Sequence, residues 1–403
     1  MLQKDIVIVG GARTPMAEYA GTPGAGKLKG FSACELGAFA GKAALERSKV
    51  HPAWIDHVVM GLANHDAVDA LYGARDVCLR IEGIPVETPA LTVNRICGSG
   101  AQAIVNGAQM ILLDEADFVL AGGMESMSQT PYAVRGIRGT PMRFGPGVLL
   151  EDVLFQSLNH PLIGMFMAQT AEKLARRYGV TREESDQCAY ESQMRAKAAI
   201  EKGLFEEEKV PVEITDRKGN VTVVNEDDHC RPDTTLGALA KLRPAFGRDG
   251  MVTAGNASGI VDGGAAVVVT TMEKAKEHNL SPLARIVSWG IAGVDPTVMG
   301  LGPAPASRKA LEKANLTMDD IDLWEVNEAF APQYVAVEKE LGLERSRVNV
   351  NGGAIALGHP LGATGCILTL KLIMEMRRRK ARYGISTMCI GGGQGIALLV
   401  EAV

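Results

Sequence analysis

The segment with the clearest chemical potential is Asn94–Gly100 (NRICGSG), which places the Cys97 thiol in a turn of small residues. An uncharged run from Ala101 to Leu113 follows and predicts a buried helix. Backbone N–H groups and the positive end of the helix dipole at such a helix start favour thiolate over thiol. Because the thiolate is the nucleophilic form, the placement suits covalent catalysis. The alternative is an ordinary buried core cysteine.

Three further side chains, all far along the chain, match the needs of a nucleophilic thiol. His359 lies among glycines in Gly358–Gly362 (GHPLG), and imidazole is the side chain suited to act as a base near neutral pH. Cys389 ends an apolar run just before three glycines, and Asn327 precedes Glu-Ala-Phe. The structural alternatives are a core histidine, a buried strand cysteine and a helix-capping asparagine.

These segments, together with Gly255–Gly259 (GNASG), strongly resemble the thiolase family, the acyl-CoA:acetyl-CoA C-acyltransferases. The resemblance covers essentially the whole chain, and the motifs occur in family order. It implies reversible acyl transfer between 3-ketoacyl-CoA and coenzyme A by a ping-pong mechanism, as in fatty acid metabolism and β-oxidation. Coenzyme A is then a substrate, and no metal or other cofactor is expected.

The resemblance also implies a role for each reactive side chain. Cys97 carries the acyl group, and His359 takes its proton and later helps to hold a thioester oxygen. Cys389 moves the α-proton of acetyl-CoA. Asn327 fixes a water that forms one oxyanion hole with His359, and backbone N–H groups of Cys97 and Gly391 form the second. Glycine suits this position because no side chain blocks the oxygen.

A second set of residues matches positions that contact coenzyme A or line the acyl pocket in the family. They are Ser258, Arg231, Phe246, Met167, Met299, Ala329 and Phe330. An isolated methionine is more often plain core packing, so the two methionines depend on the resemblance.

One departure concerns substrate range. Some biosynthetic acetoacetyl-CoA thiolases have His-Met-Gly where this chain has Phe166-Met167-Ala168. The histidine near the coenzyme is therefore absent, and the stretch Val326–Tyr334 resembles the broader 3-ketoacyl-CoA thiolases. A strict acetoacetyl-CoA thiolase remains the alternative. Decarboxylating ketoacyl synthases and a non-catalytic partner subunit are disfavoured, because Cys389 and all four reacting side chains are present.

The elements that must position these residues occur twice. Each half has a strand-rich start, at Asp5 and at Ala284, and then a small-residue turn, a buried helix, an apolar strand and a glycine pair. This pattern indicates a layered α/β fold. The resemblance implies a duplicated, five-layered αβαβα thiolase fold with halves 1–280 and 281–403. A loop domain at about 127–250, with a helix at 183–203, interrupts the first half.

Composition excludes other classes of function. The formal net charge of −5 gives no basic field for nucleic acid or anionic membranes, and no apolar stretch is long enough to span a bilayer. The seven cysteines contain no C-x-x-C pair, which favours a reducing compartment, and we expect the cytoplasm. We also expect a homotetramer, with a multienzyme partner as an option.

Two other motifs have a simple structural interpretation. Gly21–Lys27 has the spacing of a phosphate-binding P-loop, but Leu28 stands where a Mg²⁺-binding hydroxyl is needed. It is therefore predicted to be a surface loop. The basic run Arg377–Lys380 is expected to end a helix, where cations complement the dipole. The alternative is that it contacts phosphates.

Overall fold

Two half-chains with the same order of strands and helices build the protein. The computed structural model describes residues 2–65, 67–138, 149–247 and 249–403. The first half contains β1 (Ile6–Arg13), β2 (Ala17–Glu18), α1 (Ala33–Ser48), β3 (His57–Gly61), α2 (Ala74–Arg80), β4 (Ala90–Val93), α3 (Ser99–Leu112), β5 (Val119–Glu125), β12 (Val261–Thr271) and α8 (Met272–Glu277). The second half contains β13 (Ala284–Gly293), α9 (Pro303–Ala314), β14 (Leu323–Val326), α10 (Ala331–Leu341), α11 (Ala354–Leu357), α12 (Leu361–Arg379), β15 (Tyr383–Ile390) and β16 (Gln394–Ala402).

The sheets of the two halves have matching topology. In the first half the strand order is β4-β3-β5-β12-β1, and in the second it is β14-β15-β16-β13. The pairs β3–β5 and β14–β15 are parallel, whereas β5–β12, β12–β1, β15–β16 and β16–β13 are antiparallel. The two sheets meet where β1 and β13 pair over two residues each. The duplication predicted from the sequence is thus visible in four strands of each half, and β4 has no counterpart among the described strands of the second half.

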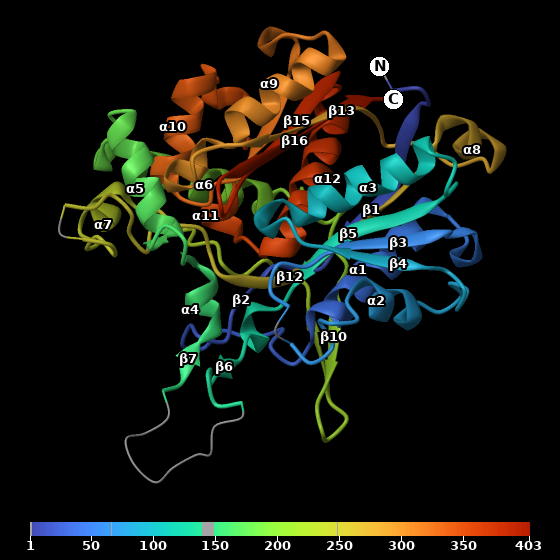
Figure 1. The fold of residues 1–403 in the computed structure, drawn as a ribbon, viewed down its shortest axis with the longest axis horizontal. Coiled ribbons are helices and arrows are strands. Elements are labelled where there is room, and N and C mark those ends of the chain that lie inside the picture. The colour runs from blue at the N-terminus through green and yellow to red at the C-terminus, as the bar shows by residue number, and fades with distance from the viewer. Residues whose placement is uncertain (1, 66, 139–148, 248) are drawn as a thin grey trace.

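Five layers result from this duplication (Figure 1). Helices α3 and α12 pack against each other between the two sheets, α1 covers the outer face of the first sheet, and α9 covers that of the second. Helix α12 is buried from Leu361 to Met376 because both of its faces meet protein. The αβαβα thiolase fold is therefore confirmed.

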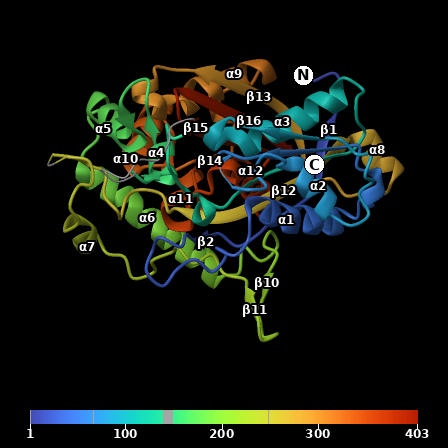
Figure 2. The ribbon, with the colours of Figure 1, turned by 60° about the horizontal axis from the view of Figure 1, so that its bottom comes forward.

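A long excursion between β5 and β12 forms the region predicted as a loop domain. Its elements are β6 (Tyr132–Ala133), β7 (Glu151–Asp152), α4 (Val153–Ser157), β8 (Asn159–His160), β9 (Met165–Phe166), α5 (Met167–Arg177), α6 (Arg182–Glu201), β10 (Val212–Thr215), β11 (Val221–Val224) and α7 (Leu236–Ala240). Figure 2 shows α4 to α7 gathered at one end of the molecule, while the β10–β11 hairpin projects below the sheets. Residues 139–148 and 248 of the predicted range lie outside the described residues, and the proposed domain boundaries stay a prediction.

Helix α6 begins where a capping box forms. The Thr181 side chain accepts the Glu184 N–H, and the Glu184 side chain accepts the Thr181 N–H. This reciprocal pair satisfies helix N–H groups that have no partner within the helix. In the described chain no helix is long and apolar enough to cross a membrane.

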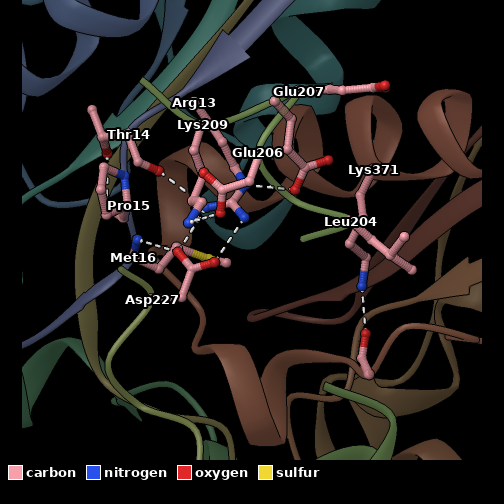
Figure 3. A network of polar contacts seen from close by, with 12 residues as sticks. Arg13, Thr14, Pro15, Met16, Leu204, Glu206, Glu207, Lys209, Asp227 and Lys371 are labelled. Carbon is pink, nitrogen blue, oxygen red and sulfur yellow. Dashed lines mark hydrogen bonds and ion pairs between the residues drawn. The ribbon is translucent and has the colours of Figure 1, made fainter. Parts of the chain in front are cut away.

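A buried network of ion pairs attaches the excursion to the first half (Figure 3). Arg13, at the end of β1, makes a two-bond contact with Asp227 at 2.7 and 2.8 Å and contacts Glu208 at 2.8 Å. Deeper in the core, Lys371 of α12 pairs with Glu325 of β14 at 2.9 Å and donates to the Gly352 carbonyl. Buried charges of this kind need such partners to offset desolvation.

Candidate active site

Cys97 lies on a strained turn at the start of α3. The turn is a short 3-10 segment, η2 (Ile96–Gly98), and Ile96 has φ of 47°, a region that β-branched residues rarely adopt. Two hydrogen bonds hold it: Ile96 N–H donates to Asn94 Oδ1 at 2.8 Å, and Ser99 Oγ donates to the Ile96 carbonyl at 2.7 Å. Backbone strain maintained by its surroundings is typical of functional positions.

The surroundings of Cys97 correct one expectation. The thiol packs against Met127, Leu154 and Leu361. Burial raises its pKa to about 12, although backbone N–H groups of Gly391 and of Cys97 itself act in the opposite direction. The Cys97 pKa is therefore raised rather than lowered at this helix start, because desolvation outweighs the backbone hydrogen bonds. A nearby base must take the proton.

Cys389 is buried at the end of β15, close to Cys97. Burial raises its pKa, and the charge of Cys97 raises it further. Desolvation is the larger of these two effects on the Cys389 pKa. Both sulfurs are held as thiols at rest, so each can give up a proton only to a specific partner.

The turn after Cys389 brings the Gly391 N–H to the Cys97 sulfur. A Cβ on Gly391 would lie 3.3 Å from Met167 Sδ, so glycine leaves this side of the thiol open. Gly392 and Gly393 have φ of 85° and 90°, which favours glycine at both positions. Gly391 therefore lies beside Cys97, and its role as an oxyanion donor stays a prediction.

His359 is a neutral base whose tautomer is determined by its neighbours. Its Nδ1 lies 2.6 Å from Thr364 Oγ1, and that hydroxyl donates to the Pro360 carbonyl at 3.0 Å. The hydroxyl must therefore accept the Nδ1 proton, which leaves a lone pair on Nε2. Burial lowers the pKa of His359 to about 4, so the imidazole is uncharged at neutral pH.

Asn327 directs its amide at this lone pair. Its Nδ2 lies 3.3 Å from His359 Nε2, while its Oδ1 is buried without a hydrogen-bond partner among the described residues. Asn327 follows β14 and precedes α10, which begins only at Ala331, so it does not cap that helix. The structure thus brings together two side chains that the sequence places 32 residues apart.

A buried carboxylate shapes the backbone around Asn327. Glu328 accepts hydrogen bonds from Ser192 Oγ at 2.6 Å and from Asn349 Nδ2 at 2.8 Å. Asn349 also exchanges two hydrogen bonds with the Val326 backbone, at 2.8 and 2.9 Å. These contacts connect the Asn327 segment with α6 and with the segment that precedes α11.

Glu125 is a neighbour of the site that sequence reasoning missed. It ends β5 and accepts backbone N–H groups from Ala63 and Asn64 at 3.1 Å each and from Gly362 at 2.8 Å. Burial raises its pKa to about 7. It joins the start of α12, which follows His359, to the first half. The available signal was an acidic residue at the end of an apolar, glycine-containing run.

Most of the residues expected to bind substrate gather beside Cys389. One apolar group consists of Met299, Ala329, Cys389, Met167 and Phe330. A neighbouring group adds Phe246 to Phe330. Ser258 N–H donates to the Ala329 carbonyl at 3.0 Å, so the GNASG segment lies beside this apolar group.

Arg231 is the exception among the predicted contacts. Its Nη2 donates to Glu18 Oε2 at 2.6 Å, and its side chain is 51% exposed. It belongs to neither apolar group. Phe166, at the position of the missing histidine, lies 4.6 Å from Phe155 and 5.8 Å from Phe246 between ring centroids, within an aromatic cluster.

Among the described residues, potential metal ligands converge away from this site, at Cys34, Asp69 and Asp76. Cys34 Sγ lies within hydrogen-bonding reach of two backbone carbonyls, at 3.6 and 3.8 Å. Burial raises its pKa to about 12, which disfavours the thiolate that metals bind. The three residues provide no ligand set for the Cys97 site.

Cys97, Cys389 and the Gly391 N–H lie together, and Leu361 and Ala329, two residues after His359 and Asn327, pack beside these thiols. Known proteins share this arrangement of the chain. Residues 6–273 match the thiolase N-terminal domain and residues 280–402 the thiolase C-terminal domain. The chain belongs to the thiolase family. It is an acyltransferase of the thiolase type.

Individual members of the family are similar to this chain over nearly its full length. The mitochondrial 3-ketoacyl-CoA thiolase of Homo sapiens is 51% identical over 100% of this chain and 99% of its own. The acetyl-CoA acetyltransferase of Cupriavidus necator is 46% identical over 98% and 99%. The crystal structure of the human mitochondrial 3-ketoacyl-CoA thiolase in complex with CoA has a TM-score of 0.95, with 50% identity over 100% of this chain and 99% of that chain.

Proposed function

We propose that this thiolase catalyses reversible exchange between a 3-ketoacyl-CoA plus coenzyme A and an acyl-CoA plus acetyl-CoA, with Cys97 as the nucleophile. The observation that carries the proposal is the convergence of Cys97, Cys389 and the Gly391 N–H, because it supplies a nucleophile, a second proton carrier and an oxyanion donor at one place. A similar protein whose structure is a complex with CoA supports coenzyme A as a substrate.

In the first half-reaction, the Cys97 proton passes to His359 Nε2 and the sulfur attacks the keto carbon. The bond between C2 and C3 of the substrate breaks, and its electron pair becomes the enolate of acetyl-CoA. Cys389 gives its proton to C2, so acetyl-CoA leaves and Cys389 becomes a thiolate. Splitting the reaction through an acyl-cysteine divides one difficult step into two easier ones.

In the second half-reaction, coenzyme A gives its thiol proton to Cys389 and attacks the acyl group. The Cys97 sulfur departs and recovers its proton from His359, so every group returns to its starting state. The high thiol pKa values suit this cycle, because each thiolate forms only as a proton has a destination. Condensation follows the same steps in reverse.

Two oxyanion sites support these steps. The Asn327 amide and the protonated His359 face the enolate oxygen, directly or through a water. The Gly391 and Cys97 N–H groups face the oxygen of the acyl-enzyme. Removal of one such donor typically costs about 10²–10³ in rate. No metal or redox cofactor enters the scheme.

The nucleophile is tested by trapping. After incubation with labelled acetyl-CoA and acid quench, the wild-type protein should carry covalent label, and Cys97→Ser should carry none. Cys366→Ser is a matched control, since Cys366 is a buried thiol of α12 outside the proposed machinery. Label retained on Cys97→Ser would disprove the assignment.

For substrate range we propose a broad 3-ketoacyl-CoA thiolase, with a strict acetoacetyl-CoA thiolase as the alternative. The support is Phe166, whose aromatic neighbours Phe155 and Phe246 occupy the region where a histidine would favour the short substrate. Steady-state kcat/KM values for acetoacetyl-CoA and for longer 3-ketoacyl-CoAs decide between them. Equal or better use of the longer substrates supports the broad enzyme, and strict use of acetoacetyl-CoA refutes it.

Coenzyme A itself is proposed to contact Ser258, Phe246 and Arg231. The pantetheine arm would pass Ser258, and Arg231 would meet a phosphate after exchanging its contact with Glu18. Arg231→Gln should raise KM for coenzyme A and leave kcat nearly unchanged. A drop in kcat alone would contradict that role.

The physiological setting is proposed from the same reasoning. We propose a role in β-oxidation, a homotetramer that can join a multienzyme complex, and the cytoplasm as the compartment. Relatives that are about 50% identical include proteins named mitochondrial, so fractionation of the native cells is the deciding measurement for the compartment. Light scattering on the purified protein decides the oligomer.

A further inference from the structure

A cavity lies at the opposite end of α12 from His359. It has a volume of about 620 Å³ and is formed where the C-terminal ends of α1 and α12 meet β1 and the segment before β13. Small-molecule sites have volumes of about 300–1,000 Å³ and favour junctions between structural units. Arg377 lies 16 residues after Leu361, or about 24 Å along the helix, so this cavity is separate from the acyl-transfer site.

The lining of the cavity is strongly basic. Arg47, Lys49, Arg377 and Arg378 line it, and its one acidic residue is Glu207. The Glu207 side chain is 70% exposed and lies 4.0 Å from Arg378. The whole chain carries a net charge of −5, so this concentration of positive charge is local and does not reflect bulk composition.

Several of these cations lack an acceptor. In the described part of the chain, the side chains of Lys49 and Arg377 make neither a hydrogen bond nor an ion pair. Arg378 Nε contacts Glu375 at 2.9 Å and Nη1 contacts the Leu204 carbonyl at 2.9 Å, but its buried Nη2 has no acceptor among the described residues. Arg378 also lines a neighbouring cavity of about 490 Å³, together with Arg195, Lys202 and Arg379.

Compensation of helix dipoles explains only part of this arrangement. Both α1 and α12 end here, and one cation in each last turn would complement the partial negative charge. That effect accounts neither for the concave shape nor for the buried guanidinium N–H without an acceptor. A ligand with several anionic oxygens accounts for both, because guanidinium groups bind phosphate oxygens through two parallel hydrogen bonds.

We propose that this cavity binds a small molecule with a di- or triphosphate group. Four cations and one carboxylate line the cavity, two of the cations at the end of α1 and two on α12, so the net lining charge is +3. A single phosphate carries about −1.5 to −2 and leaves part of this charge unneutralised, whereas a diphosphate carries more negative charge. The site therefore bridges the two halves of the fold. It uses the basic run at the end of α12, which the acyl-transfer reaction does not need.

Calorimetric titration of the full-length protein tests this proposal. Pyrophosphate and ADP are titrated separately in the absence of coenzyme A, because coenzyme A itself carries a diphosphate and would compete for the cavity. Both probes should bind the wild-type protein. Lys49→Gln and Arg377→Gln should each weaken binding by at least about 10-fold, since each removes a charge-assisted hydrogen bond. Lys380→Gln is the matched control, because this neighbouring cation does not line the cavity.

The outcomes are distinct. ADP binding tighter than pyrophosphate identifies a nucleotide as the ligand class, and equal binding identifies the diphosphate group alone. Thiolase activity should stay unchanged in all three variants, which separates this site from the acyl-transfer site. Absence of heat with both probes at millimolar concentration, or equal affinity in Arg377→Gln, would overturn the proposal.

Discussion

Arg95 and Gln394 connect the two sides of the acyl-transfer site. Arg95 Nη1 donates to Gln394 Oε1 at 2.6 Å, although the two residues are 299 positions apart in the chain. Arg95 stands two residues before Cys97, and Gln394 follows the Gly391–Gly393 turn. The bond therefore sets the spacing between the Cys97 and Gly391 N–H groups, which come from different halves. Arg95 Nε also donates to Gln102 at 2.8 Å, which fixes the guanidinium on α3.

A double-mutant cycle on this pair should show strong coupling. Arg95→Ala and Gln394→Ala should each lower kcat by about 10- to 100-fold, because a displaced oxyanion donor loses part of its effect. The double variant should be hardly worse than either single variant. Steady-state thiolysis measures all four proteins. Additive losses, or a change confined to KM, would argue against a positioning role.

Thr364 should affect kcat because its hydroxyl determines the tautomer of His359. Thr364→Val removes the acceptor for the Nδ1 proton, so the lone pair no longer stays on Nε2. We expect kcat to fall by about 10- to 100-fold, a part of the usual 10²–10⁴ from general acid–base catalysis. Thr364→Ser keeps the hydroxyl and should restore most activity. Equal damage from both substitutions would indicate a packing effect.

The buried, neutral state of His359 makes stability depend on pH. Its pKa is lowered by burial from 6.5 to about 4, so between these values the unfolded chain binds more protons than the folded one. Stability must therefore fall as the pH drops through this window, by about 2 kcal/mol from pH 7 to 5 for this group. The check is urea unfolding at both pH values, with His359→Gln as the comparison. An identical pH dependence in the variant would refute the assignment.

His359 and Cys389 are proposed to carry different protons. A substitution of Cys389 should therefore block α-proton exchange without blocking formation of the acyl-enzyme. Cys389→Ala should still form the acyl-enzyme, because Cys97 and His359 are intact. It should not exchange the α-protons of acetyl-CoA with solvent, since the side chain that moves them is absent. Deuterium incorporation followed by mass spectrometry measures this. Undiminished exchange would assign the α-proton to another group.

The buried ion pairs of Arg13 should contribute more to the free energy of unfolding than the exposed ion pairs of the excursion do. Asp227→Ala leaves the Arg13 guanidinium with Glu208 alone, and removal of one partner from a buried pair costs about 3–5 kcal/mol. Glu206→Gln removes an ion pair with Lys209 in which Glu206 is 57% exposed, and should cost no more than about 1 kcal/mol. Denaturant unfolding compares the two. Similar losses would contradict the difference in burial.

Several elements follow from local sequence alone. The uncharged run after Cys97 predicted α3, and the apolar run that ends at Cys389 corresponds to β15. The observed ends of helices differ by one or two residues from the predicted ends, as for α6, because capping interactions determine where a helix begins and ends. At Lys380 a left-handed cap ends α12 after the basic run. The internal duplication in the sequence predicted two sheets of similar topology. It did not predict that the two sheets would be joined through pairing of β1 with β13.

For the site, the sequence by itself determined the chemistry: two thiols, an imidazole and an amide in motifs of one family. Protonation states, partners and spacing were decided by the tertiary structure. Burial depends on what packs around a group, so only the fold shows that Cys97 is a thiol and His359 a neutral base. Thr364, Glu125 and the Arg95–Gln394 bond were invisible for the same reason. Their roles come from contacts across the two halves, and no local pattern encodes those distances.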